Sequence, residues 1–130
     1  MGLEHAKHNE SLCKELSEKK VYFDWIVTTA FYSALHYVEH QLFPLTVGPS
    51  TFSSFDTYYS RFKVNNDNKH YARKRLVYSN ISSDAGAAYN WLMDNCWTAK
   101  YYDYTTCEQD ADIAIQKLEK IKAAMTKSLV

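Results

Sequence analysis

An imidazole and a guanidinium stand one helical turn apart at His70 and Arg73. If the segment from Lys69 to Val77 is helical, these two side chains share one face of the helix. An imidazole that titrates near neutral pH can move protons, and an arginine keeps its charge beside a phosphate. The pair therefore suggests proton transfer next to a phosphate group, although any histidine in a basic helix would have the same spacing.

Positive charge is concentrated around this pair. The stretch from Val21 to Ser60 contains no lysine or arginine, whereas six cations follow between positions 61 and 75, opposed only by Asp67. These six are Arg61, Lys63, Lys69, Arg73, Lys74 and Arg75. Cations at this density repel one another unless an anion relieves them, so a phosphate ligand is one explanation. The other is a solvated polar connector.

A second histidine pattern could hold a metal. His36-x-x-Glu39-His40 matches the H-x-x-E-H pattern of one class of zinc proteases. A helix would place both imidazoles on one face beside the carboxylate, but a catalytic zinc needs a further protein ligand. The simpler interpretation makes His36 a partly buried residue and His40 a surface residue near a helix end. A di-iron site fails because too few Glu-x-x-His ligands are present. We therefore expect no metal and no cofactor.

The elements that must position these residues are helices. Between Gly2 and Pro44 there is no Gly or Pro, and after Pro49 the only breaker is Gly86. An all-β chain of this length would need many more turn residues. We predict one all-α domain over residues 1–130. Its expected architecture is an up-and-down four-helix bundle, with one or two short extra helices in the connection between the second and third long helices.

The long helices are predicted from apolar periodicity and capping residues. The first runs from about Leu3 to Ser17, and the second, apolar nearly all round, runs from about Tyr22 to Phe43. The third follows Ser82-Ser83, and its inward stripe ends at Cys96 and Trp97. The fourth is predicted to begin at Thr105-x-x-Glu108, which matches a capping box.

The connection after the second helix is less regular. The residues that suggest a short amphipathic helix there are Phe52, Phe55, Tyr59 and Phe62. The run from Asn65 to Asn68 predicts a turn that caps another short helix beginning near Lys69. Tyr71 and the run from Tyr101 to Tyr104 can stack nucleic-acid bases, or serve as core or interface residues.

The composition of the chain limits the partners and the compartment that can be expected. The 15 Lys and Arg balance the 15 Asp and Glu, so net charge predicts no partner. Three cysteines, Cys13, Cys96 and Cys107, are odd in number and never spaced as CxxC, which favours a reduced cytoplasmic compartment. The apolar stretch from Val21 to Phe43 is interrupted by charged and His residues. Its uncharged run is too short to span a bilayer, so no membrane partner is expected.

The second predicted helix carries a family resemblance. The segment from Tyr22 to Glu39, YFDWIVTTAFYSALHYVE, is similar to the second helix of HEPN domains, which are small bundles of four or five helices. The segment from Ala6 to Leu16 resembles their first helix, and His70-x-x-Arg73 falls where one HEPN branch has an H-x-x-R element. Ala99-Lys100-Tyr101 resembles an A-R-Y at the end of their third long helix. The resemblance covers most of the chain.

What the resemblance implies is RNA handling. Catalytic HEPN domains are metal-independent endoribonucleases that usually act as dimers. By this analogy His70 would move protons to and from the ribose 2′-hydroxyl and the leaving oxygen. Arg73 would bind the scissile phosphate, and the product would end in a 2′,3′-cyclic phosphate. The residues expected to hold flanking phosphates are Arg61, Lys69, Lys74 and Arg75.

Three functions stay open at this point. The catalytic HEPN signature places a His four to six residues after an Arg, whereas here His70 precedes Arg73 and Lys74 stands where an Asn is common. Many HEPN domains are non-catalytic. The chain is therefore expected to be a homodimeric endoribonuclease, a module that binds RNA or nucleotides, or an interaction module. The expected partner of an interaction module is a nucleotidyltransferase or an antitoxin-type protein.

Overall fold

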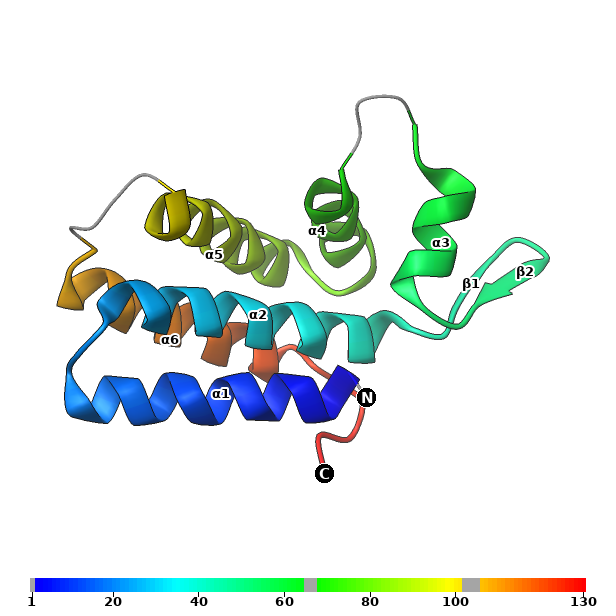
Figure 1. Ribbon diagram of the computed structural model, residues 1–130. Coiled ribbons are helices and arrows are strands. Elements are labelled where there is room, and N and C mark those ends of the chain that lie inside the picture. The colour runs from blue at the N-terminus through cyan, green and yellow to red at the C-terminus, as the bar shows by residue number, and fades with distance from the viewer. Residues whose placement is uncertain (1, 65–67, 102–105) are drawn as a thin grey trace.

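Helices make up most of the regular structure. A computed structural model describes residues 2–64, 68–101 and 106–130. Within these ranges the elements, drawn in Figure 1, are α1 (Gly2–Lys19), α2 (Phe23–Leu42), β1 (Leu45–Val47), β2 (Ser50–Phe52), α3 (Phe55–Phe62), α4 (Lys69–Asn80), α5 (Ser83–Tyr101) and α6 (Glu108–Ala123). The prediction of a mainly helical chain is confirmed. The antiparallel pair β1–β2, in which Thr46 lies opposite Thr51, was not predicted.

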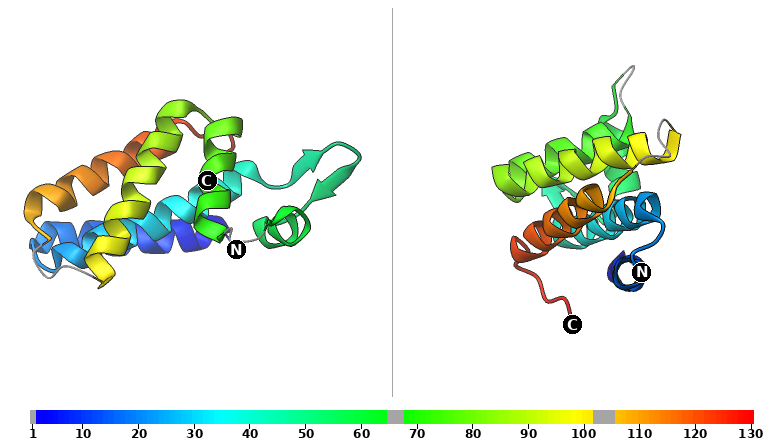
Figure 2. Two further views of the ribbon diagram at one scale, coloured as in Figure 1. Left: turned by 90° about the horizontal axis from the view of Figure 1, so that it is seen from above. Right: turned by 90° about the vertical axis from the view of Figure 1, so that its left-hand side faces the viewer.

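Helix α2 is the central element. It packs against α1, α5 and α6, and α4 lies over its C-terminal half (Figure 1). Most of its residues are buried, as expected for a helix that is apolar nearly all round. Seen from above, α5 crosses α2 obliquely instead of running alongside it (Figure 2). In the described part of the chain, no helix is long and apolar enough to cross a membrane.

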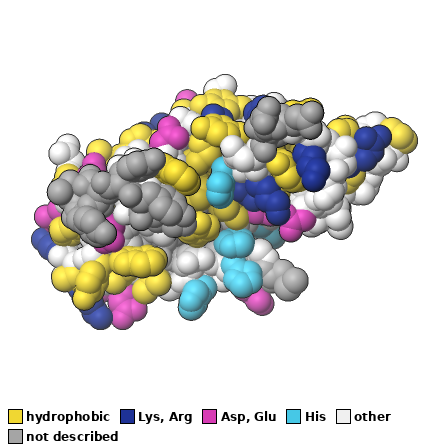
Figure 3. Space-filling model, turned by 45° about the horizontal axis from the view of Figure 1, so that its top comes forward, with side chains coloured by type: hydrophobic (Ala, Val, Ile, Leu, Met, Phe, Trp, Pro, Cys, Tyr) yellow, Lys and Arg dark blue, Asp and Glu magenta, His cyan; other side chains and the backbone are white. Residues whose placement is uncertain are grey.

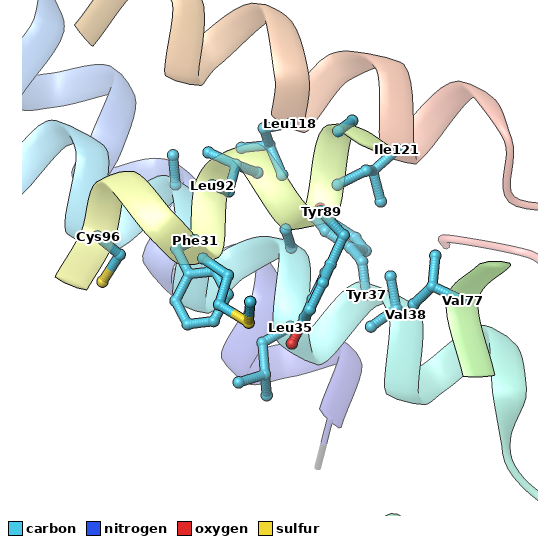
Figure 4. Close-up of a cluster of buried hydrophobic side chains, with 14 of the residues drawn as sticks. Phe31, Leu35, Tyr37, Val38, Val77, Tyr89, Leu92, Cys96, Leu118 and Ile121 are labelled. Carbon is cyan, nitrogen blue, oxygen red and sulfur yellow. The ribbon is translucent and has the colours of Figure 1, made fainter. Parts of the chain in front are cut away.

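The hydrophobic core fills the space between α2, α5 and α6 (Figure 4). Phe31 of α2 and Tyr89 of α5 meet there, with their ring centroids 5.5 Å apart. Other core side chains shown in the figure are Leu35, Tyr37, Val38, Val77, Leu92, Cys96, Leu118 and Ile121. Cys96 is buried as predicted, whereas Trp97, which was expected on the same inward stripe of α5, is 55% exposed.

The segment after α2 corrects one helix prediction. Phe52 belongs to β2, and α3 begins only at Phe55, after Ser54 caps it with a reciprocal capping box to Thr57. The ring of Phe52 lies 5.8 Å from Tyr58 and 5.4 Å from Phe62, measured between centroids. The aromatic spacing that suggested a helix from Phe52 therefore reflects packing of the hairpin on α3.

Two other helix starts were predicted, with different outcomes. Asn68 caps α4 as expected, because its side-chain Oδ1 accepts a hydrogen bond from the Tyr71 backbone N–H at 3.0 Å. Helix α6 begins two residues later than predicted, since its N-cap is Cys107, whose backbone N–H donates to the Asp110 carboxylate at 3.2 Å. Thr105, the expected cap, lies outside the described residues.

A buried polar network ties α1 to α2 and α6. The Tyr37 hydroxyl donates to Glu10 Oε1 at 2.6 Å, and Lys122 Nζ donates to Glu10 Oε2 at 2.6 Å. Burial alone would raise the pKa of Glu10, but the hydrogen bonds from Lys122 and Tyr37 outweigh it and leave this pKa below 4.5. Burial, together with the hydrogen bond to Glu10, raises the pKa of Tyr37. Glu10 is therefore held in its charged form between three helices.

We expect this network to make stability depend on acid. Because folding lowers the pKa of Glu10, its contribution is complete above pH 4.5 and is lost as the pH falls through the folded-state pKa. Glu10→Gln should lower the free energy of unfolding at pH 7 by about 2 kcal/mol and flatten its decline below pH 4.5. Urea denaturation at several pH values measures both effects. Glu15→Gln, which breaks only the exposed pair with Lys19, is the matched control.

A second prediction concerns the approach of α4 to α5 at Gly86. A Cβ atom placed there would lie 2.5 Å from the Tyr78 ring, well inside contact distance. Helix propensity alone favours Gly86→Ala by about 1 kcal/mol. We expect the overlap to dominate, so that Gly86→Ala lowers the free energy of unfolding by about 1–3 kcal/mol. In a Tyr78→Ala background the ring is absent, so adding Gly86→Ala should cost much less stability than it does in the wild-type chain. An equal cost in both backgrounds would contradict the overlap.

Candidate functional site

A hollow with a volume of about 680 Å³ lies between α2, α4 and α5. Its lining residues are Phe31, Tyr32, Asn68, His70, Tyr71, Met93, Asp94, Cys96, Trp97 and Thr98. We call this hollow the aromatic cleft. In the space-filling view, histidine and hydrophobic side chains lie next to each other on the face where α4 and α5 come forward (Figure 3).

The floor and the walls of the aromatic cleft differ in burial. Phe31, Met93 and Cys96 are buried and belong to the core, so they form an apolar floor. Tyr71 and Trp97 are 47% and 55% exposed, although each has a large apolar ring. Exposed aromatic rings at the mouth of a concave apolar site are typical of ligand binding rather than of a folding requirement.

His70 enters the aromatic cleft from the first turn of α4. Its ring centroid lies 5.5 Å from that of Phe31, and its Nδ1 lies 3.3 Å from Arg73 Nη1. An arginine can only donate hydrogen bonds, so Nδ1 of His70 is the acceptor in this contact. A neutral imidazole with an acceptor at Nδ1 carries its proton on Nε2. Arg73 thus selects the tautomer in which Nε2 is the hydrogen-bond donor.

Arg73 itself is buried, with 5% of its surface exposed. Its Nε lies 3.3 Å from Glu39 Oε2, its Nη1 lies 3.4 Å from the Tyr89 hydroxyl, and its guanidinium lies 4.3 Å from the Phe55 ring centroid. Burial raises the pKa of Glu39, and the charge of Arg73 partly offsets this. Burial also raises the pKa of Tyr89, to about 12. Arg73 therefore joins α2, α3 and α5 to α4.

The other predicted phosphate ligands do not gather at the aromatic cleft. Lys69 pairs with Asp56 of α3 at 3.1 Å. Arg61 lies over the Phe62 ring, and Arg75 lines a separate hollow of about 120 Å³ between α3 and α4. Lys74 alone of these four approaches the cleft, with its Nζ 4.6 Å from the Tyr71 ring centroid. The cluster that is dense in sequence is thus divided between two sides of α4.

The possible zinc pattern on α2 is also separated in space. His36 stacks on His5 of α1, with ring centroids 5.1 Å apart, and burial, His5 and Arg73 together lower its pKa. Glu39 pairs with Arg73, while a ring nitrogen of His40 lies 3.0 Å from the backbone oxygen of Ser128. Among the described residues, no three His, Cys, Asp or Glu side chains are grouped so that they could hold a metal ion.

Sequence patterns identified only part of this site. His70 and Arg73 come together as predicted, and Tyr71 was already a candidate for base stacking. Tyr32, Asp94 and Trp97 were missed because they stand at the edges of apolar stripes that predict core packing. The one sequence feature that could have indicated them is weak: Trp97 stands at the border of the apolar stripe, one turn after the acidic Asp94. The predicted stacking residues 102–104 lie outside the described residues.

Comparison with family models, with curated proteins and with solved structures returned no match for this chain.

The Arg73–Glu39 pair leads to a prediction on stability. Glu39→Gln would leave a buried guanidinium without its counter-charge, and we expect the free energy of unfolding to fall by about 3 kcal/mol. Chemical denaturation at pH 7 measures the loss. Asp56→Asn breaks the exposed pair with Lys69 and should cost less than about 1 kcal/mol. Equal small losses in both variants would show that the burial of the Arg73 charge does not depend on Glu39.

Proposed function

We propose that this chain is a HEPN-like up-and-down helical bundle that binds RNA or nucleotides, with a base held in the aromatic cleft. The observation that carries the proposal is that exposed Tyr71 and Trp97 line one concave apolar site together with His70. Successive bases stack on such rings irrespective of sequence, and each stacked base contributes about 1–3 kcal/mol. A volume of about 680 Å³ is ample for one nucleotide.

Binding is favoured over cleavage by the state of the two predicted catalytic residues. The charge of Arg73 is already balanced by Glu39, and its guanidinium is buried, so contact with a scissile phosphate would require it to leave this partner. Nδ1 of His70 accepts from Arg73, so this nitrogen is not available as a general base. The metal-independent endoribonuclease with His70 and Arg73 in catalytic roles stays a prediction from sequence.

Phosphates of a bound strand would lie outside the aromatic cleft. Lys74 at the Tyr71 edge is placed to meet the first of them. Arg61, Lys69 and Arg75 stand further along the α3 side of α4, where they can meet a strand that continues past the cleft. Binding should therefore weaken as salt concentration rises, because each phosphate contact releases counterions.

A protein partner is the second candidate, and a different surface favours it. Tyr22 is 66% exposed and Trp25 is 55% exposed, and Val21 next to them is also exposed at the turn between α1 and α2. Aromatic residues exposed together in this way are common anchors of protein interfaces. This surface would serve the interaction module, with a nucleotidyltransferase or antitoxin-type partner or a second copy of the chain.

The two exposed tryptophans allow a matched test. Trp97→Ala should weaken binding of a short single-stranded RNA by about 5- to 150-fold, because one stacking partner is lost. Trp25→Ala, at an equally exposed tryptophan outside the aromatic cleft, should leave this affinity unchanged. Fluorescence anisotropy of labelled RNA at low salt measures both, with circular dichroism to verify folding.

Two results would overturn the proposal. Absence of RNA and nucleotide binding by the wild-type chain at low salt would remove it, as would equal affinities in Trp97→Ala and wild type. The same samples, incubated with a chelator, test the nuclease prediction. Cleavage that disappears in His70→Ala would establish that activity instead of simple binding.

A further inference from the structure

The charge of the aromatic cleft sets a limit on what part of a ligand enters it. Of the lining residues described, Asp94 is the one with a carboxyl group, and none is a lysine or arginine. A phosphate placed inside would meet a carboxylate without a compensating cation, which is unfavourable. The part of the ligand inside the cleft is therefore an uncharged flat ring, and it should offer N–H donors to Asp94.

We propose that the aromatic cleft prefers guanine among the nucleic-acid bases; this specificity rests on the proposed function. Guanine carries two adjacent donors, N1–H and the N2 amino group, on its pairing edge. A carboxylate has two oxygens and only accepts hydrogen bonds, so it can take both donors side by side. Guanine also presents the acceptors O6 and N7 along its major-groove edge.

The position of Asp94 suits this pair of guanine donors. Asp94 lies on α5 one turn before Trp97, so a ring stacked on the indole would have its edge close to the carboxylate. Its contact with Asn90, 3.4 Å from Nδ2 to Oδ2, is long and leaves most of its acceptor capacity. His70 of α4 lines the same cleft beside Phe31, with the two ring centroids 5.5 Å apart.

The other bases match this arrangement less well. Adenine has an acceptor at N1, which would face the negative carboxylate. Cytosine offers one amino group beside the acceptor N3, and uracil offers one N–H between two carbonyl oxygens. Each of them can make at most one hydrogen bond to Asp94 from its pairing edge, whereas guanine makes two. Hypoxanthine, which is guanine without the N2 amino group, separates the contribution of that single donor.

The test is a set of titrations of the full chain with GMP, IMP, AMP and UMP, followed by tryptophan fluorescence and calorimetry. We expect GMP to bind about 5- to 150-fold more tightly than AMP or UMP, with IMP between them. Asp94→Asn keeps the shape but replaces one acceptor oxygen with a donor. It should remove the preference for GMP over AMP, because an amide can no longer accept both guanine donors. Asp112→Asn, at an exposed position on α6, is the matched control.

The outcomes separate this inference from the function on which it rests. Equal affinities of the wild-type chain for GMP, IMP and AMP would overturn the guanine preference while leaving nucleotide binding intact. A GMP preference that persists in Asp94→Asn would overturn the role of Asp94. Absence of binding by all four nucleotides and by RNA would overturn both proposals. The comparison of GMP with IMP needs no variant, so it holds even if Asp94→Asn does not fold.

Discussion

A guanidinium that is always charged cannot be buried unless an anion and hydrogen-bond acceptors are placed around it. Glu39 from α2 supplies the anion for Arg73, as an ion pair in which the buried Nε makes no hydrogen bond. Tyr89 from α5 and Phe55 at the start of α3 contact the same guanidinium. Because this single side chain contacts three other helices, α2, α3 and α5, it sets how α4 lies on them. The position of His70, one turn earlier on α4, follows from it.

The same constraint determines what the aromatic cleft can do chemically. Arg73 of α4 faces inward. On the same helix, His70 and Lys74 lie on the side of the cleft, and Arg75 lies on the side of α3. Arg73, which the sequence suggested as the ligand of the scissile phosphate, is thereby engaged within the protein. The cleft retains rings, one carboxylate and an imidazole of defined tautomer, which is a set of groups suited to a base rather than to a phosphate.

The predicted elements were close to those observed wherever a local signal was strong. The bounds of α1 and α2 and the Asn68 cap follow from periodicity and from side-chain capping, which act over a few residues. Phe52 was assigned to a helix because aromatic side chains at helical spacing do not reveal whether they pack along one helix or across a hairpin. The start of α6 was misplaced for a related reason, since two neighbouring residue pairs could each form a capping box.

Interactions between residues a few positions apart account for the helices, for the extensive burial of α2, and for the shared helix face of His70 and Arg73. Tertiary structure alone decided the rest. Whether a cation faces a ligand or a buried carboxylate depends on a partner such as Glu39, which lies on another helix. Whether Tyr32, Asp94 and Trp97 form a core or a cleft depends on the angle at which α5 crosses α2, and no local pattern encodes that angle.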